Sequence, residues 1–169
     1  MTNKPEGKTV VVLGGSIGGL GVAHRLLKYT LPSHQDLKVI LVSQNSHFYW
    51  NPAAVRAIIP EILQDDELLQ PIAPGFEQYN KSTQHSLAAE FVHGKAKSID
   101  VAGKSVLVNP ASSDASARTI RYDYLVISTG SRSAVPGMPW KADGSYEDLV
   151  EAIHVTASRV CTGHTGQRG

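Results

Sequence analysis

The sequence is poor in cysteine, with Cys161 as the only one among 169 residues. A single cysteine excludes an internal disulfide framework, and it excludes a redox-active Cys-x-x-Cys or Cys-x4-Cys pair. No dithiol of this chain can therefore carry electrons. Cys161 and His164 are too few candidate ligands for a metal site, so we expect no bound metal and interpret residues 161–169 as a disordered tail.

Charge of one sign and long apolar runs are also lacking. Sixteen basic residues oppose fifteen acidic ones, and no basic stripe typical of nucleic-acid binding is present. No apolar run reaches the length of a membrane span, and glycines interrupt the first apolar segment, which argues against a transmembrane segment and a secretory signal. The hydrophobic content of 41% is that of a globular protein, for which we expect a location in the cytosol.

The most informative stretch is TVVVLGGSIGGLGVAHRLL, at residues 9–27. Residues 9–13 form a β-branched apolar run that predicts a strand, and helical spacing of apolar residues predicts a helix over 17–29. The glycine turn between them matches a dinucleotide-binding pattern, in which the backbone approaches a pyrophosphate at the helix N-terminus. Its phosphate-binding candidates are Gly14, Gly15, Ser16 and Gly19, with Ser16 where the pattern has Gly. An ordinary glycine turn without a ligand is the alternative.

A second strand is predicted at residues 37–42, and its end lacks the Asp or Glu that usually binds the adenosine ribose. Ser43 and Gln44 stand there instead and are our candidates for that contact. The loop at 47–52 then has four consecutive aromatic or imidazole side chains, which form either a small satellite core or the wall of a ligand site. Arg56 lies in a short predicted helix at 52–59, either as a clamp for a diphosphate or on a solvated face.

The middle of the chain predicts shorter elements. Residues 60–84 contain Pro71, Pro74 and Gly75, which predict a loop-rich crossover with one short helix near 61–69. Short strands at 90–93, 96–101 and 104–109, with a tight turn at 102–103 and a last strand at 118–121, indicate an antiparallel meander.

The third informative stretch is YDYLVISTG, at residues 122–130. It predicts a parallel strand at 125–128 after a turn at Asp123, and Thr129 and Gly130 then allow the backbone to come close to a ligand at the carboxyl edge of the sheet. A capped helix is predicted over 145–158.

Together these motifs resemble the FAD-dependent pyridine nucleotide-disulfide oxidoreductase superfamily, especially fungal members of its apoptosis-inducing-factor-like and ferroptosis-suppressor-like NAD(P)H oxidoreductases. The resemblance covers roughly residues 8–160 and rests on VVVLGGSIGGLGVAHRLL, SQNSHFYWNPAAVRAIIP, EFVHGKAKSID and YDYLVISTGSRS. It implies an α/β, Rossmann-like FAD-binding domain over 1–160, with a parallel sheet and an inserted antiparallel β-meander, incomplete at the C-terminus.

The resemblance also implies residue roles and a reaction. FAD pyrophosphate would lie on the glycine turn and near Thr129 and Gly130, the flavin would contact Arg56, and the adenine would meet the backbone of Ala96. NAD(P)H would be the co-substrate, and a quinone or similar small molecule the electron acceptor. Because no second Gly-rich βαβ unit follows, we expect the N-terminal part of a longer enzyme, with weak FAD binding and little activity on its own.

Two other functions remain open at this point. A single-domain NAD(P)-dependent dehydrogenase of the short-chain class needs Tyr-x-x-x-Lys, and none of the six tyrosines has Lys four residues later. A non-catalytic nucleotide-binding or regulatory remnant would fit the missing NAD(P)H unit. Flavin absorbance of the purified protein would favour the oxidoreductase, whereas a colourless protein that binds a partner would favour the remnant.

Overall fold

The structure is a computed structural model, and it describes residues 7–53, 56, 59, 62–82, 88–112, 115–130 and 146–163. The chain divides into two compact units. The first consists of residues 1–46 and 71–130, and the second of residues 47–70 and 131–169.

The first unit is built on one sheet of six strands in the order β7-β6-β5-β2-β1-β8. Parallel pairing joins β1 to β2 and β8, and β2 to the first half of β5, whereas β5-β6 and β6-β7 are antiparallel. The elements are β1 (Thr9–Leu13), α1 (Ile17–Arg25), the π-helical η1 (Leu26–Thr30), β2 (Lys38–Ser43), α4 (Ile72–Ser82), β5 (Ala89–Asp100), β6 (Ser105–Pro110), β7 (Arg118–Arg121) and β8 (Tyr124–Ile127). The predicted α/β fold with a parallel sheet and an antiparallel meander is confirmed.

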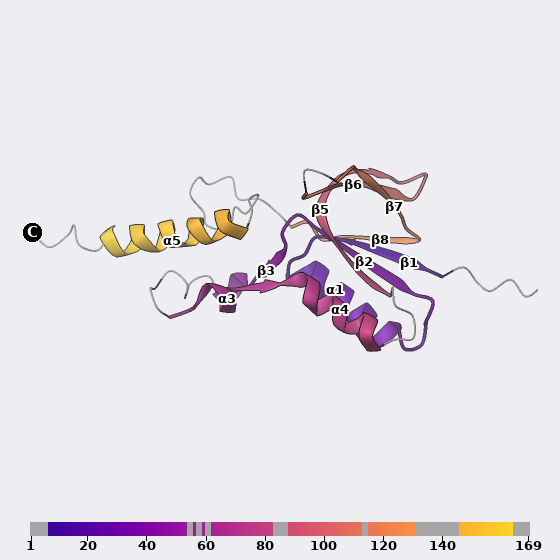
Figure 1. Cartoon of the computed structure of the whole chain (residues 1–169), viewed down its shortest axis with the longest axis horizontal. Helices are drawn as coiled ribbons and strands as arrows, with labels where there is room; N and C mark the ends of the chain where they lie inside the picture. The colour runs from indigo at the N-terminus through magenta and orange to yellow at the C-terminus, as the bar shows by residue number, and fades with distance from the viewer. Residues whose placement is uncertain are drawn as a thin grey trace, which may run out of the picture. The chain divides into compact units, whose positions relative to one another are not determined.

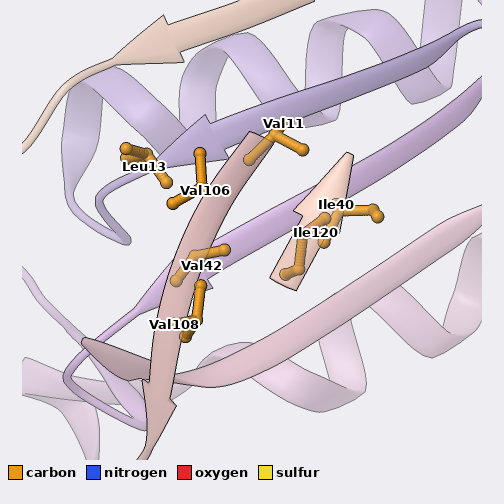
Figure 2. Close-up of a cluster of buried hydrophobic side chains, with 7 residues drawn as sticks. All are labelled: Val11, Leu13, Ile40, Val42, Val106, Val108 and Ile120. Carbon is orange, nitrogen blue, oxygen red and sulfur yellow. The ribbon is translucent and has the colours of Figure 1, made fainter. Parts of the chain in front are cut away.

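This unit has three layers. Helices α1 and α4 lie on one side of the parallel strands, and β6 and β7 lie on the other (Figure 1). Since side chains alternate across a strand, β1 and β2 each contribute residues to both interfaces. Figure 2 shows the interface with the meander, which consists of Val11, Leu13, Ile40, Val42, Val106, Val108 and Ile120.

Polar contacts hold the strands at their ends. The Asp123 carboxylate accepts a hydrogen bond from the Thr9 N–H at 2.8 Å and pairs with Lys8 at 3.2 Å. The Thr9 N–H and the Lys8 ammonium hold the pKa of Asp123 below its usual range. Asp123 therefore serves the turn before β8, as predicted.

Glu90 connects three strands, because its carboxylate pairs with Lys38 of β2 at 2.7 Å and with Arg118 of β7. Burial raises the pKa of Glu90, but the hydrogen bonds and charges of Arg118 and Lys38 outweigh this effect and leave the pKa below its ordinary value. The ionised carboxylate is thus the form that stabilises this corner of the sheet.

The loop-rich crossover predicted for residues 60–84 is wrong over 72–82, which form α4. Pro74 lies in the first turn of this helix, where an N–H has no intrahelical acceptor to lose. Gly75 lies beside the His24 ring, with room for a Cβ 3.7 Å from Cε1. Ile72 and Phe76, four residues apart and both buried, are the helical signal that the prolines obscured.

The two strands predicted at 90–93 and 96–101 form the single strand β5. A Cβ on Gly94 would lie 2.6 Å from the Asn109 oxygen, so glycine lets β6 approach closely while the strand continues. The first half of β5 belongs to the parallel sheet and the second half to the meander.

The second unit contains a small apolar cluster of Ala53, Leu68, Leu69 and Ile153, with Tyr49, Leu63, Tyr146 and Val150 packed against it. Its elements are β3 (His47–Tyr49), η2 (Asn51–Ala53), α3 (Asp65–Leu68), β4 (Leu69–Pro71, paired with β3) and α5 (Tyr146–Gly163). Part of the aromatic loop therefore lies in a satellite core, although Trp50 is exposed.

The predicted helices of this unit match in part. The helix expected near 61–69 is limited to α3 in the described residues. Helix α5 continues to Gly163, past the predicted end at 158, so the prediction of a disordered tail is wrong over residues 161–163. Outside the described residues lie the first residue of the helix predicted over 145–158, residues 54, 55, 57 and 58 of the helix predicted at 52–59, and residues 164–169 of the predicted tail. None of the helices in the described part of the chain is long and apolar enough to cross a membrane.

Candidate functional site

The turn after β1 requires glycine at two positions for backbone reasons. Gly14 has a φ of 110°, and a Cβ there would lie 2.1 Å from the Ser128 carbonyl oxygen. Its N–H donates to the Val42 carbonyl at 2.8 Å, which fixes the turn against β2. A Cβ on Gly19 would lie 1.8 Å from the Gly14 carbonyl oxygen, so the first turn of α1 packs directly on the glycine loop.

Two further glycines bring the loop against neighbouring strands. A Cβ on Gly15 would lie 2.6 Å from Ser43 Oγ, and one on Gly18 would lie 2.6 Å from Ser128 Oγ. Gly21 of the same helix differs, since nothing lies within 4 Å of its added Cβ. The close packing of the loop therefore requires the four glycines that precede Gly21, namely Gly14, Gly15, Gly18 and Gly19. Sequence analysis named neither Gly18 nor Ser128 as a site residue. The available signal was the small side chain of Ser128 directly after β8, which allows the close approach of Gly18.

The start of α1 is suited to an anion. Ser16 is the N-cap, with φ −108° and ψ −169°, and its exposed side chain makes no capping hydrogen bond. The first turn of α1 contains no acidic residue, and the first N–H groups of a helix have no intrahelical acceptor. Together with the positive end of the helix dipole, these groups favour a phosphate.

The end of β8 lies beside this turn. The Ser128 N–H donates to the Leu13 carbonyl at 2.8 Å, and Thr129 and Gly130 follow as exposed residues, with Gly130 at φ 71°. The structure therefore brings together two candidate segments that are far apart in the sequence, the glycine turn and Thr129 with Gly130.

The end of β2 forms the other side of the turn. Ser43 is 5% exposed, and its hydroxyl accepts a hydrogen bond from the Asn45 N–H at 3.2 Å. Gln44 is exposed, and its carbonyl lies 3.0 Å from Nε2 of His93. Of the two ribose candidates, Gln44 thus has the accessible side chain, whereas the side chain of Ser43 is buried next to Gly15.

Two candidates remain, Ala96 and Arg56. Ala96 faces Val108 across the β5-β6 ladder and packs against the meander core, past the point where β5 leaves β2. Arg56 is exposed and belongs to the second unit. Over the part of the chain that the structure describes, no three His, Cys, Asp or Glu side chains gather to hold a metal ion. The ligand roles of all ten site residues stay predictions.

Comparisons with known proteins agree with the resemblance found in the sequence. The model of the family "Pyridine nucleotide-disulphide oxidoreductase" matches residues 8–161. Oxidoreductase ptaL of Pestalotiopsis fici is 43% identical over 159 residues, which are 94% of this chain and 40% of that protein. The sulfide-quinone reductase of Aquifex aeolicus is 32% identical over 145 residues, which are 83% of this chain and 27% of that protein.

The solved structure of the sulfide:quinone oxidoreductase from Aquifex aeolicus superposes with a TM-score of 0.64 at 28% identity, covering 91% of this chain and 32% of that one. The chain thus spans less than half the length of these relatives. Since the family model covers nearly the whole sequence, the chain belongs to the pyridine nucleotide-disulphide oxidoreductase family, whose members are FAD-dependent oxidoreductases with NAD(P)H as co-substrate.

Proposed function

We propose that residues 1–160 are the FAD-binding portion of an NAD(P)H-dependent oxidoreductase that passes electrons to a quinone or a similar small acceptor. The observation that carries this proposal is the glycine turn between β1 and α1, where the lack of a Cβ at Gly14 and Gly19 lets the backbone after β8 and the turn itself come closer than any side chain would allow. The cytosol remains the expected compartment.

The residues of the turn fit a dinucleotide pyrophosphate. The N–H groups at the start of α1 and the backbone at Ser16, Thr129 and Gly130 would hold the phosphates. Gln44 would contact the adenosine ribose, and Arg56 and the Ala96 backbone would contact the flavin and the adenine. When bound, FAD supplies the capacity to accept hydride and pass electrons on, and the chain's own residues bind and orient it.

A quinone acceptor is supported by the relative from Aquifex aeolicus, which is a sulfide-quinone reductase by name. The single cysteine of this chain is consistent with an acceptor reduced without a protein dithiol. We name no acid or base, because hydride transfer from nicotinamide to flavin does not require one.

The test is titration of the purified chain with FAD, followed by quenching of flavin fluorescence. We expect weak but saturable binding, its loss in Gly19→Val, and its retention in the matched control Gly21→Ala, whose added methyl group meets no neighbour. Absence of saturable binding by the wild-type chain, or equal binding by Gly19→Val, would contradict the proposal. Binding of NAD(P)H at the turn in place of FAD would favour the single-domain dehydrogenase.

A further inference from the structure

At the end of the ladder between β2 and β5, strand β5 leaves β2 and pairs with β6. Ser43 of β2 pairs with His93 of β5, and β5 then continues along β6, where Gly94 lies close to Asn109. Gln44, the first residue after β2, lies beyond the last pair of this ladder, and its backbone carbonyl needs another partner or water.

The imidazole of His93 supplies that partner. Its Nε2 lies 3.0 Å from the Gln44 carbonyl oxygen, and since a carbonyl can only accept, Nε2 carries the hydrogen and donates. The ring of His93 is stacked on that of Phe91, with centroids 6.3 Å apart and an interplanar angle of 16°. Phe91 in turn packs against the buried Phe76 of α4, at 6.5 Å between centroids.

The loop that follows β2 is held at two further points. The Asn45 N–H donates to Ser43 Oγ at 3.2 Å, and the Ser46 carbonyl accepts from the Ile72 N–H at 3.0 Å. Gln44 is consequently an exposed side chain on a backbone fixed before, at and after its own position. Such preorganisation lowers the entropy that is lost when a ligand binds.

We propose that His93 is a positioning residue of the dinucleotide site, which holds the Gln44 backbone so that the Gln44 side chain binds the adenosine ribose where dinucleotide folds usually have a carboxylate. This inference rests on the proposed function. His93 acts through Gln44 and does not itself touch the ligand. The ribose contact is then made by an uncharged amide, that of Gln44, and its position depends on a side chain of β5, that of His93.

The experiment compares FAD and ADP affinities of four variants of the full 169-residue chain. His93→Ala weakens both ligands by a similar factor of roughly three to ten, the range for one lost hydrogen bond. His93→Gln, which keeps a donor, restores affinity to within about twofold. Gln44→Ala weakens binding comparably, and the double variant is no weaker than Gln44→Ala, because both changes remove one coupled interaction.

Two controls separate positioning from general stability. Ser98→Ala, at an exposed site further along β5, leaves affinity unchanged. His93→Ala, which loses one hydrogen bond, melts only a few degrees below the wild type and is fully folded at the temperature of the titrations. In the ligand-free protein, His93→Ala speeds amide hydrogen exchange at residues 44–46.

Three results would overturn the inference: unchanged FAD affinity in His93→Ala, no rescue by His93→Gln, or additive effects of His93→Ala and Gln44→Ala. If the wild-type chain binds neither FAD nor ADP, the proposed function fails and this inference fails with it.

Discussion

The close approach of α1 to the glycine loop predicts opposite effects of one methyl group at two positions of the same helix. A Cβ on Gly19 would lie 1.8 Å from the Gly14 carbonyl oxygen, whereas real Cβ atoms essentially never come within 3.0 Å of another atom. Gly14 cannot yield easily, since its N–H is bonded to Val42 at 2.8 Å and its α-carbon faces Ser128. Gly19→Ala must therefore displace the helix or break the turn.

The size of both effects follows from known substitutions. Overpacking of this kind costs about 1 to 3 kcal/mol, and more where backbone must move. Gly21→Ala adds the same atoms in open space, so it gains the helix preference of alanine over glycine, about 0.5–1 kcal/mol. The two variants should thus differ by roughly 1.5 to 4 kcal/mol.

Thermal unfolding followed by circular dichroism measures this difference directly. For a chain of this length, 1 kcal/mol corresponds to about 2–4 °C in Tm. We expect Gly21→Ala to melt slightly above the wild type and Gly19→Ala several degrees below it. Equal melting temperatures of the two variants would refute the close approach of α1 to the loop.

Three further predictions concern single side chains. Ser16→Gly should bind FAD at least as well as the wild type, because the Ser16 hydroxyl caps nothing; a tenfold loss in titration, about 1.4 kcal/mol, would instead make it a direct phosphate ligand. Glu90→Gln should destabilise the sheet by about 1 kcal/mol or less near neutral pH. Because the pKa of Glu90 is lowered in the fold, urea titrations should show this difference shrinking as the pH falls below 4.5. Burial lowers the pKa of His24, which bonds Tyr79 through Nδ1 at 3.0 Å. The unfolded chain then binds more protons, so stability falls as the pH drops below 6.5, and His24→Phe should flatten that slope; an unchanged slope would mean that His24 has the same pKa in both states.

Local sequence patterns predicted the elements whose signals are local. The β-branched run at β1, the glycine turn, β7 and the strand before Thr129 were all found, because strand and helix periods are visible within a few residues. The prediction of a parallel strand at 125–128 is also confirmed, and in the structure this strand, β8, pairs with β1. This pairing brings the two ends of the candidate site together.

Features that depend on distant segments were not predicted. The continuity of β5 depends on β6 approaching Gly94, and the burial of Ser43 depends on Gly15 lying above it. The helix α4 was missed because Pro71, Pro74 and Gly75 were interpreted as breaks, although Pro71 precedes the helix and Pro74 and Gly75 lie in its first turn, where proline is tolerated. The bond from His93 to Gln44 likewise needs the pairing of β2 with β5, which no local pattern contains.

The most direct test of the account is to locate FAD on the chain by amide chemical shifts of the isotopically labelled protein. We predict that addition of FAD shifts the amides of residues 14–19 and 128–130 most strongly, and that ADP reproduces the part of the pattern that includes Gln44. Saturating FAD that leaves the amides of the glycine turn unchanged, or shifts mainly residues elsewhere in the chain, would contradict the assignment of this turn as the flavin dinucleotide site.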